Sequence, residues 1–347
     1  MAFCRRACSG RLLLAGCCLL PSFSEGLWID NFDVLMAPVQ ELINAHSHCG
    51  WANPADLSLI ASTKSDFESQ IEIRADSCGN RLLMMGGFLQ CHSVDEHIYH
   101  EMMVHPALQT FASMAGRPPR SVFLGGSGDG AGPRELLRWQ SLQKATMVDI
   151  DYEVTRFALE WVPGFAGRSF EDPRLQLTTG DALAFLQQLP KDQTFDILIL
   201  DFPDAFDSKE LEKLYSTEFY ELCRSHMHDQ SILVTQSGPC VEVTRAGTRA
   251  KCWLLQEMIL PNLTAVFPQV EVLLHPMATW KAEIKTPSEW SSFSLARLGG
   301  DAFAHDFDLP PEIQSLRYYT SERHRAALDH PQPLKKRLRE RTPRSEL

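Results

Sequence analysis

The sequence lacks a long apolar run, a surplus of positive charge and cysteine pairs spaced for metal binding. The apolar stretch Leu12–Leu20 is far shorter than the roughly 20 residues that a membrane-spanning helix needs, so we expect no transmembrane span. The 44 aspartates and glutamates outnumber the 33 lysines and arginines, and the net charge of −11 argues against general nucleic-acid binding. No two cysteines have the C-x-x-C spacing of a zinc ribbon or a redox dithiol.

The ten cysteines therefore favour free thiols over a disulfide framework. Four of them lie in the first 26 residues, and the other six are widely spaced: Cys49, Cys78, Cys91, Cys223, Cys240 and Cys252. We expect these six to be reduced, as in a reducing compartment. His46 and His48 beside Cys49 resemble a weak metal cluster, but a surface turn explains the segment better. The sequence predicts no metal site.

Residues 1–26 differ from the rest of the chain. Arginines precede Leu12–Leu20, and small residues follow at Ser22 and Ser24. This order is the outline of a cleavable targeting peptide whose destination the sequence does not specify. A disordered leader or an incorrect start codon would produce the same pattern.

The next part of the chain predicts a small β-rich domain over residues 62–95, after a poorly patterned segment, 27–61. Three short strands are expected: Gln70–Arg74, Arg81–Met85 and Phe88–Gln90. A helix over Asp95–His105 follows, with Asp95 as its N-cap and Pro106 as a break or bend.

From Ser121 onward, strands and helices alternate regularly. The expected strands are Ser121–Leu124, Ala145–Val148, Leu175–Thr178, Phe195–Leu200, Ile232–Gln236, Val270–Leu274 and Trp290–Ala296. This alternation predicts an α/β fold with a doubly wound parallel sheet, which we assign to a catalytic domain over residues 96–330. A basic tail, residues 331–347, is interpreted as a solvated end, with targeting or an acidic partner as the alternative.

Acidic residues follow four successive strands of this predicted sheet: Asp129, Asp149, Asp181 and the pair Asp201 and Asp204. Ligands of such sheets bind beyond the carboxyl ends of the strands, so these acids predict an acidic cleft. The glycine-rich segment around Gly126 and Gly128 would bring backbone N–H groups close to a ligand. Its spacing differs from the dinucleotide fingerprint, and Asp129 would repel a pyrophosphate. A cationic sulfonium nucleoside fits this loop better.

Several sequence blocks match one enzyme family in order. They are Asn80–Gln90 (G-x-x-L-x-L-D-G-x-x-Q, with Gly86 at the usual Asp), Asp95–Glu101 (D-E-x-x-Y-H-E), Gly126–Glu135 (G-G-G-D-G-G-x-x-R-E), Asp149–Asp151, Gly180–Ala182, Asp201–Asp204 and Leu214–Tyr220. Together they resemble the polyamine aminopropyltransferases. Val234–Pro239 is most similar to the thermospermine synthase branch, and Tyr318–Ala327 to spermidine synthases.

The resemblance implies a methyltransferase-type, Rossmann-like fold after a small β-rich domain. It implies transfer of an aminopropyl group from decarboxylated S-adenosylmethionine, a co-substrate, to putrescine or spermidine. Spermidine, or thermospermine or spermine, would form together with methylthioadenosine, with no tightly bound cofactor. The partner would be a small-molecule polyamine and not a nucleic acid, and a cytoplasmic homodimer would be expected.

The resemblance also implies roles for individual residues. Asp129 would hold the amine of the donor, Asp149 both ribose hydroxyls, and Asp181 with Ala182 the adenine. The full set of expected donor-binding residues is Gln70, Gly126, Gly128, Asp129, Asp149, Asp181 and Ala182. Asp201 would take a proton from the attacking amine while Tyr99 orients that amine.

The acceptor side is expected to depart from the family pattern. The residues that would bind the acceptor are His100, Asp204, Gln236 and Trp280. Phe202 and Pro203 replace small polar residues between the two acids, and Lys281–Glu289 resembles an insertion beside the acceptor pocket.

Two alternative functions stay open at this point. A putrescine N-methyltransferase would use the same scaffold with ordinary S-adenosylmethionine, whose carboxylate Asp129 would repel. A non-catalytic nucleoside-binding relative would keep the fold without the reaction. The intact acids and Tyr99 favour the aminopropyltransferase.

Overall fold

The computed structural model describes residues 23–51, 56–205, 208–240, 243, 251–279, 290–299, 301–305, 307–313, 315–330, 334 and 336. The predicted leader lies outside these residues except for its last four, and the basic tail except for Leu334 and Lys336. Within the described ranges, no helix combines the length and apolar character that crossing a bilayer requires.

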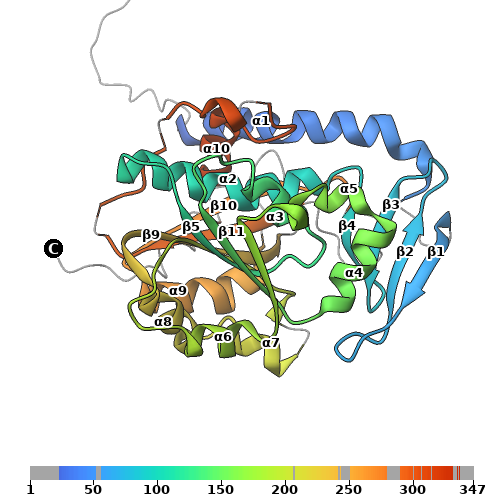
Figure 1. Cartoon of the computed structure of the whole chain (residues 1–347). Helices are drawn as coiled ribbons and strands as arrows, with labels where there is room; N and C mark the ends of the chain where they lie inside the picture. Colours follow the sequence, from blue (N-terminus) through green and yellow to red (C-terminus); the bar gives the residue numbers. More distant parts are fainter. Residues whose placement is uncertain are drawn as a thin grey trace, which may run out of the picture.

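A seven-stranded sheet forms the centre of the molecule (Figure 1). In spatial order its strands are β10 (Gln269–Pro276), β11 (Trp290–Arg297), β9 (Met227–Cys240), β8 (Phe195–Asp201), β5 (Ser121–Gly126), β6 (Lys144–Asp149) and β7 (Leu175–Thr179). The five strands from β9 to β7 are parallel, whereas β11 runs antiparallel to both β9 and β10. The predicted α/β class is confirmed, and the reversed β11 departs from the predicted all-parallel sheet.

Helices cover both faces of this sheet (Figure 1). One layer contains α1 (Phe23–His46), α2 (Glu96–Ala115), α3 (Ala131–Leu136) and α10 (Ser321–Leu328); the other contains α6 (Ala182–Gln188), α8 (Thr217–Ser225) and α9 (Leu260–Val266). Successive strand residues point to opposite faces. Val122 and Leu124 of β5 accordingly join the core under α2, while Phe123 joins the core against α6 and α8.

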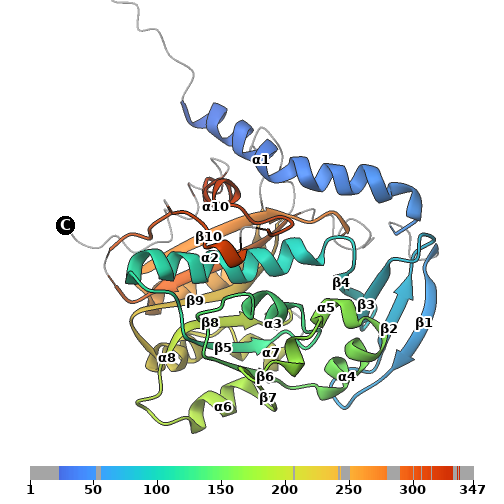
Figure 2. The same cartoon turned by 45° about the horizontal axis from the view of Figure 1, so that its top comes forward.

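A four-stranded antiparallel sheet lies at one end of the molecule (Figure 2). Its strands are β1 (Ser58–Thr63), β2 (Ile71–Ala75), β3 (Arg81–Met85) and β4 (Phe88–His92). Ile73 and Leu83 of this sheet pack against Phe157 of α4 (Tyr152–Trp161) and Phe165 of α5 (Pro163–Ala166). The small sheet is thereby fixed beside the carboxyl end of β6, where α4 begins. The short helix α7 (Lys209–Lys213) follows β8.

The helix that the sequence predicts to break or bend at Pro106 instead continues to Ala115. Apart from Tyr99, every side chain from Glu96 to Phe111 is buried. Packing on both sides outweighs the backbone hydrogen bond that proline removes. Gly116, in the left-handed conformation with φ of +64°, ends the helix.

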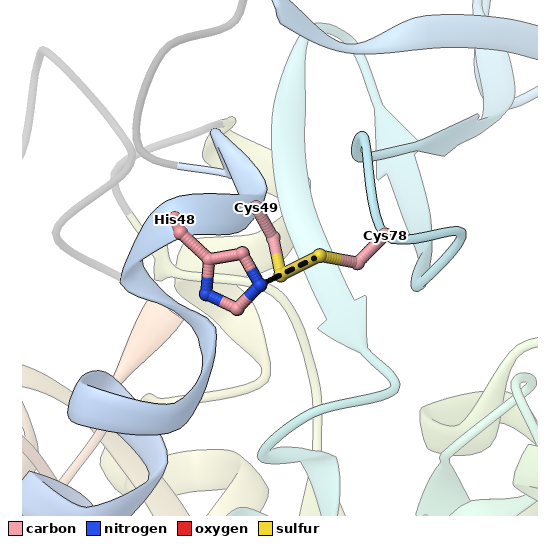
Figure 3. Close-up of side chains that lie close together, drawn as sticks. All are labelled: His48, Cys49 and Cys78. Atoms are coloured by element: carbon pink, nitrogen blue, oxygen red, sulfur yellow. Dashed lines mark hydrogen bonds between the residues drawn. A yellow bond between two sulfur atoms is a disulfide. The ribbon is translucent and has the colours of Figure 1, made fainter.

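The prediction of six free thiols was wrong for four of them. One disulfide joins Cys49, just after α1, to Cys78 in the turn between β2 and β3 (Figure 3). A second joins Cys240 at the end of β9 to Cys252. Sequence spacing does not reveal such pairs, because pairing depends on how the fold places the two Cα atoms. Among the described cysteines, Cys91 and Cys223 are free and buried.

Candidate active site

The carboxyl ends of the central strands bring three acids together. Asp201 ends β8 and is in register with Gly126 at the end of β5, while Asp149 ends β6. Asp149 interacts electrostatically with both Asp129 and Asp201. The acidic edge that the strand pattern predicts is therefore present.

The loop after β5 requires glycine at two positions, because a side chain there would collide with neighbouring atoms. A Cβ on Gly126 would lie 2.0 Å from the carbonyl oxygen of Asp201, and Gly126 has φ of +84°. A Cβ on Gly128 would lie 2.8 Å from Oδ2 of Asp149. The backbone of the loop thus passes directly against the two neighbouring strand ends.

Both carboxylate oxygens of Asp201 accept hydrogen bonds. The Tyr99 hydroxyl donates to Oδ1 at 2.8 Å, and the Ser127 hydroxyl donates to Oδ2. Burial raises the pKa of Asp201 above its usual value, although the charge of His100 and the Ser127 hydrogen bond oppose the shift. Burial and the Asp201 charge raise the pKa of Tyr99 well above its ordinary value, so Tyr99 is a neutral donor. The side chain of Asp201 is consequently fixed in position, with a raised pKa, and its role as a proton acceptor stays a prediction.

Asp129 lies in the glycine loop and faces His100 of α2. Nε2 of His100 is 3.4 Å from Oδ2 of Asp129, and the Ala131 amide donates to Oδ1 of Asp129 at 2.8 Å. Burial raises the pKa of Asp129, but the His100 charge and these hydrogen bonds outweigh it and hold the pKa below its usual value. Asp129 is therefore an ionised carboxylate at the base of the loop.

His100 is held from its other side by Glu96, one helical turn earlier. Nδ1 of His100 is 2.7 Å from the Glu96 carbonyl oxygen and 3.3 Å from Oε2 of its side chain. Arg134 of α3 forms a further ion pair with Glu96 at 2.8 Å. Burial lowers the pKa of His100, but Asp129 and Glu96 outweigh it and raise the pKa well above the ordinary value.

The remaining expected donor-binding residues lie around this centre. Burial, reinforced by neighbouring acids, raises the pKa of Asp149 to about 6. Asp181 is exposed, and its Oδ1 caps α6 by accepting from the amides of Leu183 and Ala184. Ala182 is buried at the first position of that helix. Gln70 lies just before β2, where its side chain donates to Glu72 at 2.7 Å. Their roles toward a donor stay predictions.

On the acceptor side, Gln236 of β9 donates from Nε2 to Oδ1 of Asp204. The Tyr215 hydroxyl lies 3.4 Å from the other end of the Gln236 amide. Gln236 and Asp204 are thus mutually oriented beside Asp201. Trp280 and the segment Lys281–Glu289 lie outside the described residues.

Several side chains of this site have no clear signal in the sequence. Ser127 stands at a glycine position of the family pattern, which points to no contact, yet its hydroxyl donates to Asp201. Glu96 falls in the D-E-x-x-Y-H-E block, and its position four residues before His100 was the signal for their pairing. Phe293 of β11 packs edge-on against the Tyr99 ring with centroids 4.9 Å apart, and no local pattern links residues so far apart in sequence.

Comparison with known proteins shows which family the chain resembles. Residues 96–288 match the family model described as the spermine/spermidine synthase domain. The chain belongs to that family. The polyamine aminopropyltransferase of Nitrosococcus oceani is 32% identical over 266 residues, which cover 76% of this chain and 85% of that protein.

Other relatives of the family align over a shorter part of their length. Polyamine aminopropyltransferase 1 of Hyperthermus butylicus is 39% identical over 159 residues, covering 46% of this chain and 53% of the relative. The chain thus spans about half the length of several curated relatives that it matches. The spermidine synthase of Thermotoga maritima has the same fold, with a TM-score of 0.65 at 24% identity over 81% of this chain and 88% of that one.

Proposed function

We propose that this family member is an aminopropyltransferase that uses decarboxylated S-adenosylmethionine as donor and putrescine or spermidine as acceptor. The observation that carries the proposal is the half-buried Asp129 in the glycine loop, whose pKa is held below its usual value beside His100. A donor without a carboxylate presents a free ammonium group to Asp129. Ordinary S-adenosylmethionine would bring its own carboxylate toward that acid, which disfavours methyl transfer.

The reaction is an in-line displacement at carbon. The acceptor nitrogen forms a bond to the aminopropyl carbon beside the sulfonium, the carbon–sulfur bond breaks, and its electron pair stays on the sulfur of methylthioadenosine. The attacking amine, whose pKa is ordinarily about 10, must lose a proton. Asp201 accepts that proton, and its desolvation favours the protonated form.

The neighbouring groups position the reactants for this step. Tyr99 fixes Oδ1 of Asp201, while Asp149 is placed to hold the ribose and Asp204 with Gln236 the far end of the acceptor. Alignment of two bound reactants contributes several kcal/mol to catalysis in intramolecular systems.

Product analysis tests the proposal. The purified protein is incubated with decarboxylated donor and, separately, putrescine, spermidine or cadaverine, and products are identified by mass. We expect methylthioadenosine and one elongated amine in equal amounts. Absence of methylthioadenosine with every acceptor would overturn the proposal, and methylated putrescine from ordinary S-adenosylmethionine would favour the N-methyltransferase.

The variant Asp201→Asn tests the assigned proton acceptor. An amide keeps the shape and accepts the Tyr99 hydrogen bond but takes no proton, so we expect kcat to fall by about 10²–10⁴-fold. Donor affinity, measured calorimetrically, should stay close to that of the wild type. Near-normal turnover would show that the proton leaves by another route.

A further inference from the structure

A thiol, an imidazole and a carboxylate meet beside the glycine loop. They belong to Cys91 of β4, His100 of α2 and Asp129, and one ligand atom of each lies within 4.8 Å of the other two. Cys91 is 3% exposed and His100 is 3% exposed, and the thiol of Cys91 lies within 4.8 Å of the Asp129 carboxylate. The aminopropyl transfer described above uses no thiol, so the mechanism leaves Cys91 unexplained.

The contacts of His100 match those of a metal ligand. A carbonyl oxygen can only accept, so the 2.7 Å contact from Nδ1 to the Glu96 carbonyl puts the hydrogen on Nδ1. Nε2 therefore points toward Asp129 and Cys91. Metal-binding histidines usually donate their second ring nitrogen to a carbonyl or carboxylate, which fixes the ring. Glu96 supplies both groups, and Arg134 fixes Glu96 in turn.

The separation of the His100 and Asp129 ligand atoms also fits. Nitrogen and oxygen ligands bound at about 2.1 Å to a tetrahedral ion lie about 3.4 Å apart. Nε2 of His100 and Oδ2 of Asp129 are 3.4 Å apart, longer than the roughly 2.7–2.9 Å of a strong charge-assisted hydrogen bond. Asp149 and Asp201 add negative charge nearby, which further favours a cation.

We propose that Cys91, His100 and Asp129 bind a thiophilic divalent cation of the zinc type, which blocks donor binding by occupying Asp129. A thiolate and an imidazole select zinc or cobalt over magnesium and calcium, which prefer oxygen ligands. Binding forms one metal–sulfur, one metal–nitrogen and one metal–oxygen bond, and it releases the thiol proton and the proton on Nε2. The fourth coordination position is left for water.

The other comparable cluster of the described residues differs in one respect. Nε2 of His48 lies 3.7 Å and 3.5 Å from the sulfurs of Cys49 and Cys78, but those sulfurs are joined to each other (Figure 3). A disulfide sulfur is not a thiolate and does not bind zinc in this way. The Cys91 cluster keeps its thiol available.

Cobalt binding tests the site without any reference to catalysis. Co²⁺ is added to the full-length, non-reduced protein in which Cys4, Cys8, Cys17 and Cys18 are serine. We expect a near-ultraviolet thiolate-to-cobalt charge-transfer band with a stoichiometry of one ion per chain. Cys91→Ser should abolish the band and weaken Zn²⁺ binding by at least about tenfold, as the loss of even indirect ligand support does.

The matched control is Cys223→Ser, which changes the other buried free cysteine, on α8. This variant should keep the band and the Zn²⁺ affinity. A band that survives in Cys91→Ser, or no band in the starting protein, would overturn the site.

The claim of donor competition rests on the proposed function and is tested separately. Zn²⁺ should raise the apparent KM for the donor without lowering kcat. Inhibition by Zn²⁺ is measured for each variant relative to that variant's activity without metal. In Cys91→Ser, the Zn²⁺ concentration needed for the same inhibition should rise by at least about tenfold. Inhibition that lowers kcat at unchanged KM would overturn competition. Cys91-dependent cobalt binding in a protein without aminopropyl transfer would instead refute the proposed function and leave the metal site standing.

Discussion

Ser127 combines an unfavourable backbone conformation with a hydrogen bond to Asp201, the proposed proton acceptor. Its φ of +67° is a conformation that favours glycine, so the serine persists at a cost on the order of 1 kcal/mol or more. Its hydroxyl donates to Oδ2 of Asp201 and thereby lowers the pKa of Asp201 against the effect of burial. We infer that Ser127 is a positioning residue for Asp201.

The variant Ser127→Gly should relieve the backbone strain and remove the hydrogen bond. We expect kcat to fall about tenfold, the value of one hydrogen bond to a charged group, without a lower melting temperature. Because the remaining interactions leave the pKa of Asp201 higher, the acid limb of the kcat–pH profile should move to higher pH. Ala131→Gly, the other departure from the family's glycines, should not move that limb. An unchanged limb in Ser127→Gly would contradict the assignment.

The charged form of Asp149, which the proposed ribose contact needs, lowers the stability of the folded protein. Its pKa is raised to about 6 in the folded protein, so the folded state favours the protonated carboxyl. Relative to the unfolded chain, that contribution is complete below the ordinary aspartate pKa of about 3.9 and is lost as pH rises through about 6.

Asp149→Asn should therefore raise the melting temperature at pH 8 but not at pH 4. The shift of about two pKa units sets an upper limit of about 3 kcal/mol, and partial exposure reduces it. An asparagine Oδ1 still accepts from the Asp151 amide, which bonds Asp149 at 2.8 Å. Affinity for methylthioadenosine should fall, because the variant loses the carboxylate that is proposed to hold the ribose. Destabilisation at pH 8 would refute this account.

At the scale of elements, the Cys49–Cys78 disulfide connects the segment after α1 to the small sheet. The two residues are 29 positions apart, so the bond restricts the unfolded chain more than Cys240–Cys252, which are 12 apart. Cys49→Ala with Cys78→Ala should reduce the free energy of unfolding by about 3–4 kcal/mol, measured by urea titration without reductant. The corresponding double variant at Cys240 and Cys252 should lose somewhat less. Equal midpoints for wild type and the first variant would show that the bond contributes nothing.

The helices and strands differ in how well the local sequence predicts them. The central strands were predictable because each is a short apolar run bounded by turn residues, as in β8. β1 escaped prediction because most of its side chains are exposed, which leaves no alternating pattern. Helix α1 escaped prediction because Pro38 interrupts its sequence pattern, although Leu35 and Val39 lie one turn apart and both reach the core. The clustering of acids at the strand ends was predictable from the topology. The contacts of Ser127 and Cys91 were not predictable, because they depend on how the glycine loop folds against Asp201 and β4.

At the scale of the whole molecule, charge favours the substrates that the site would use. The net charge of −11 and the acidic strand edge attract polycations from solution. The Debye length falls from about 10 Å at 0.1 M salt to about 3 Å at 1 M, so added salt screens this attraction.

We expect kcat/KM for the acceptor to fall several-fold over that range of ionic strength, more steeply for a triamine than for a diamine. The kcat should change little, because the hydrogen bonds around Asp201 are partly buried and salt screens partly buried groups much less than exposed ones. Asp204→Asn removes one acid next to Gln236 and should flatten the salt dependence without moving the pH profile of kcat. A kcat that falls with salt while kcat/KM stays constant would show that the charge acts on the chemical step and not on capture of the amine.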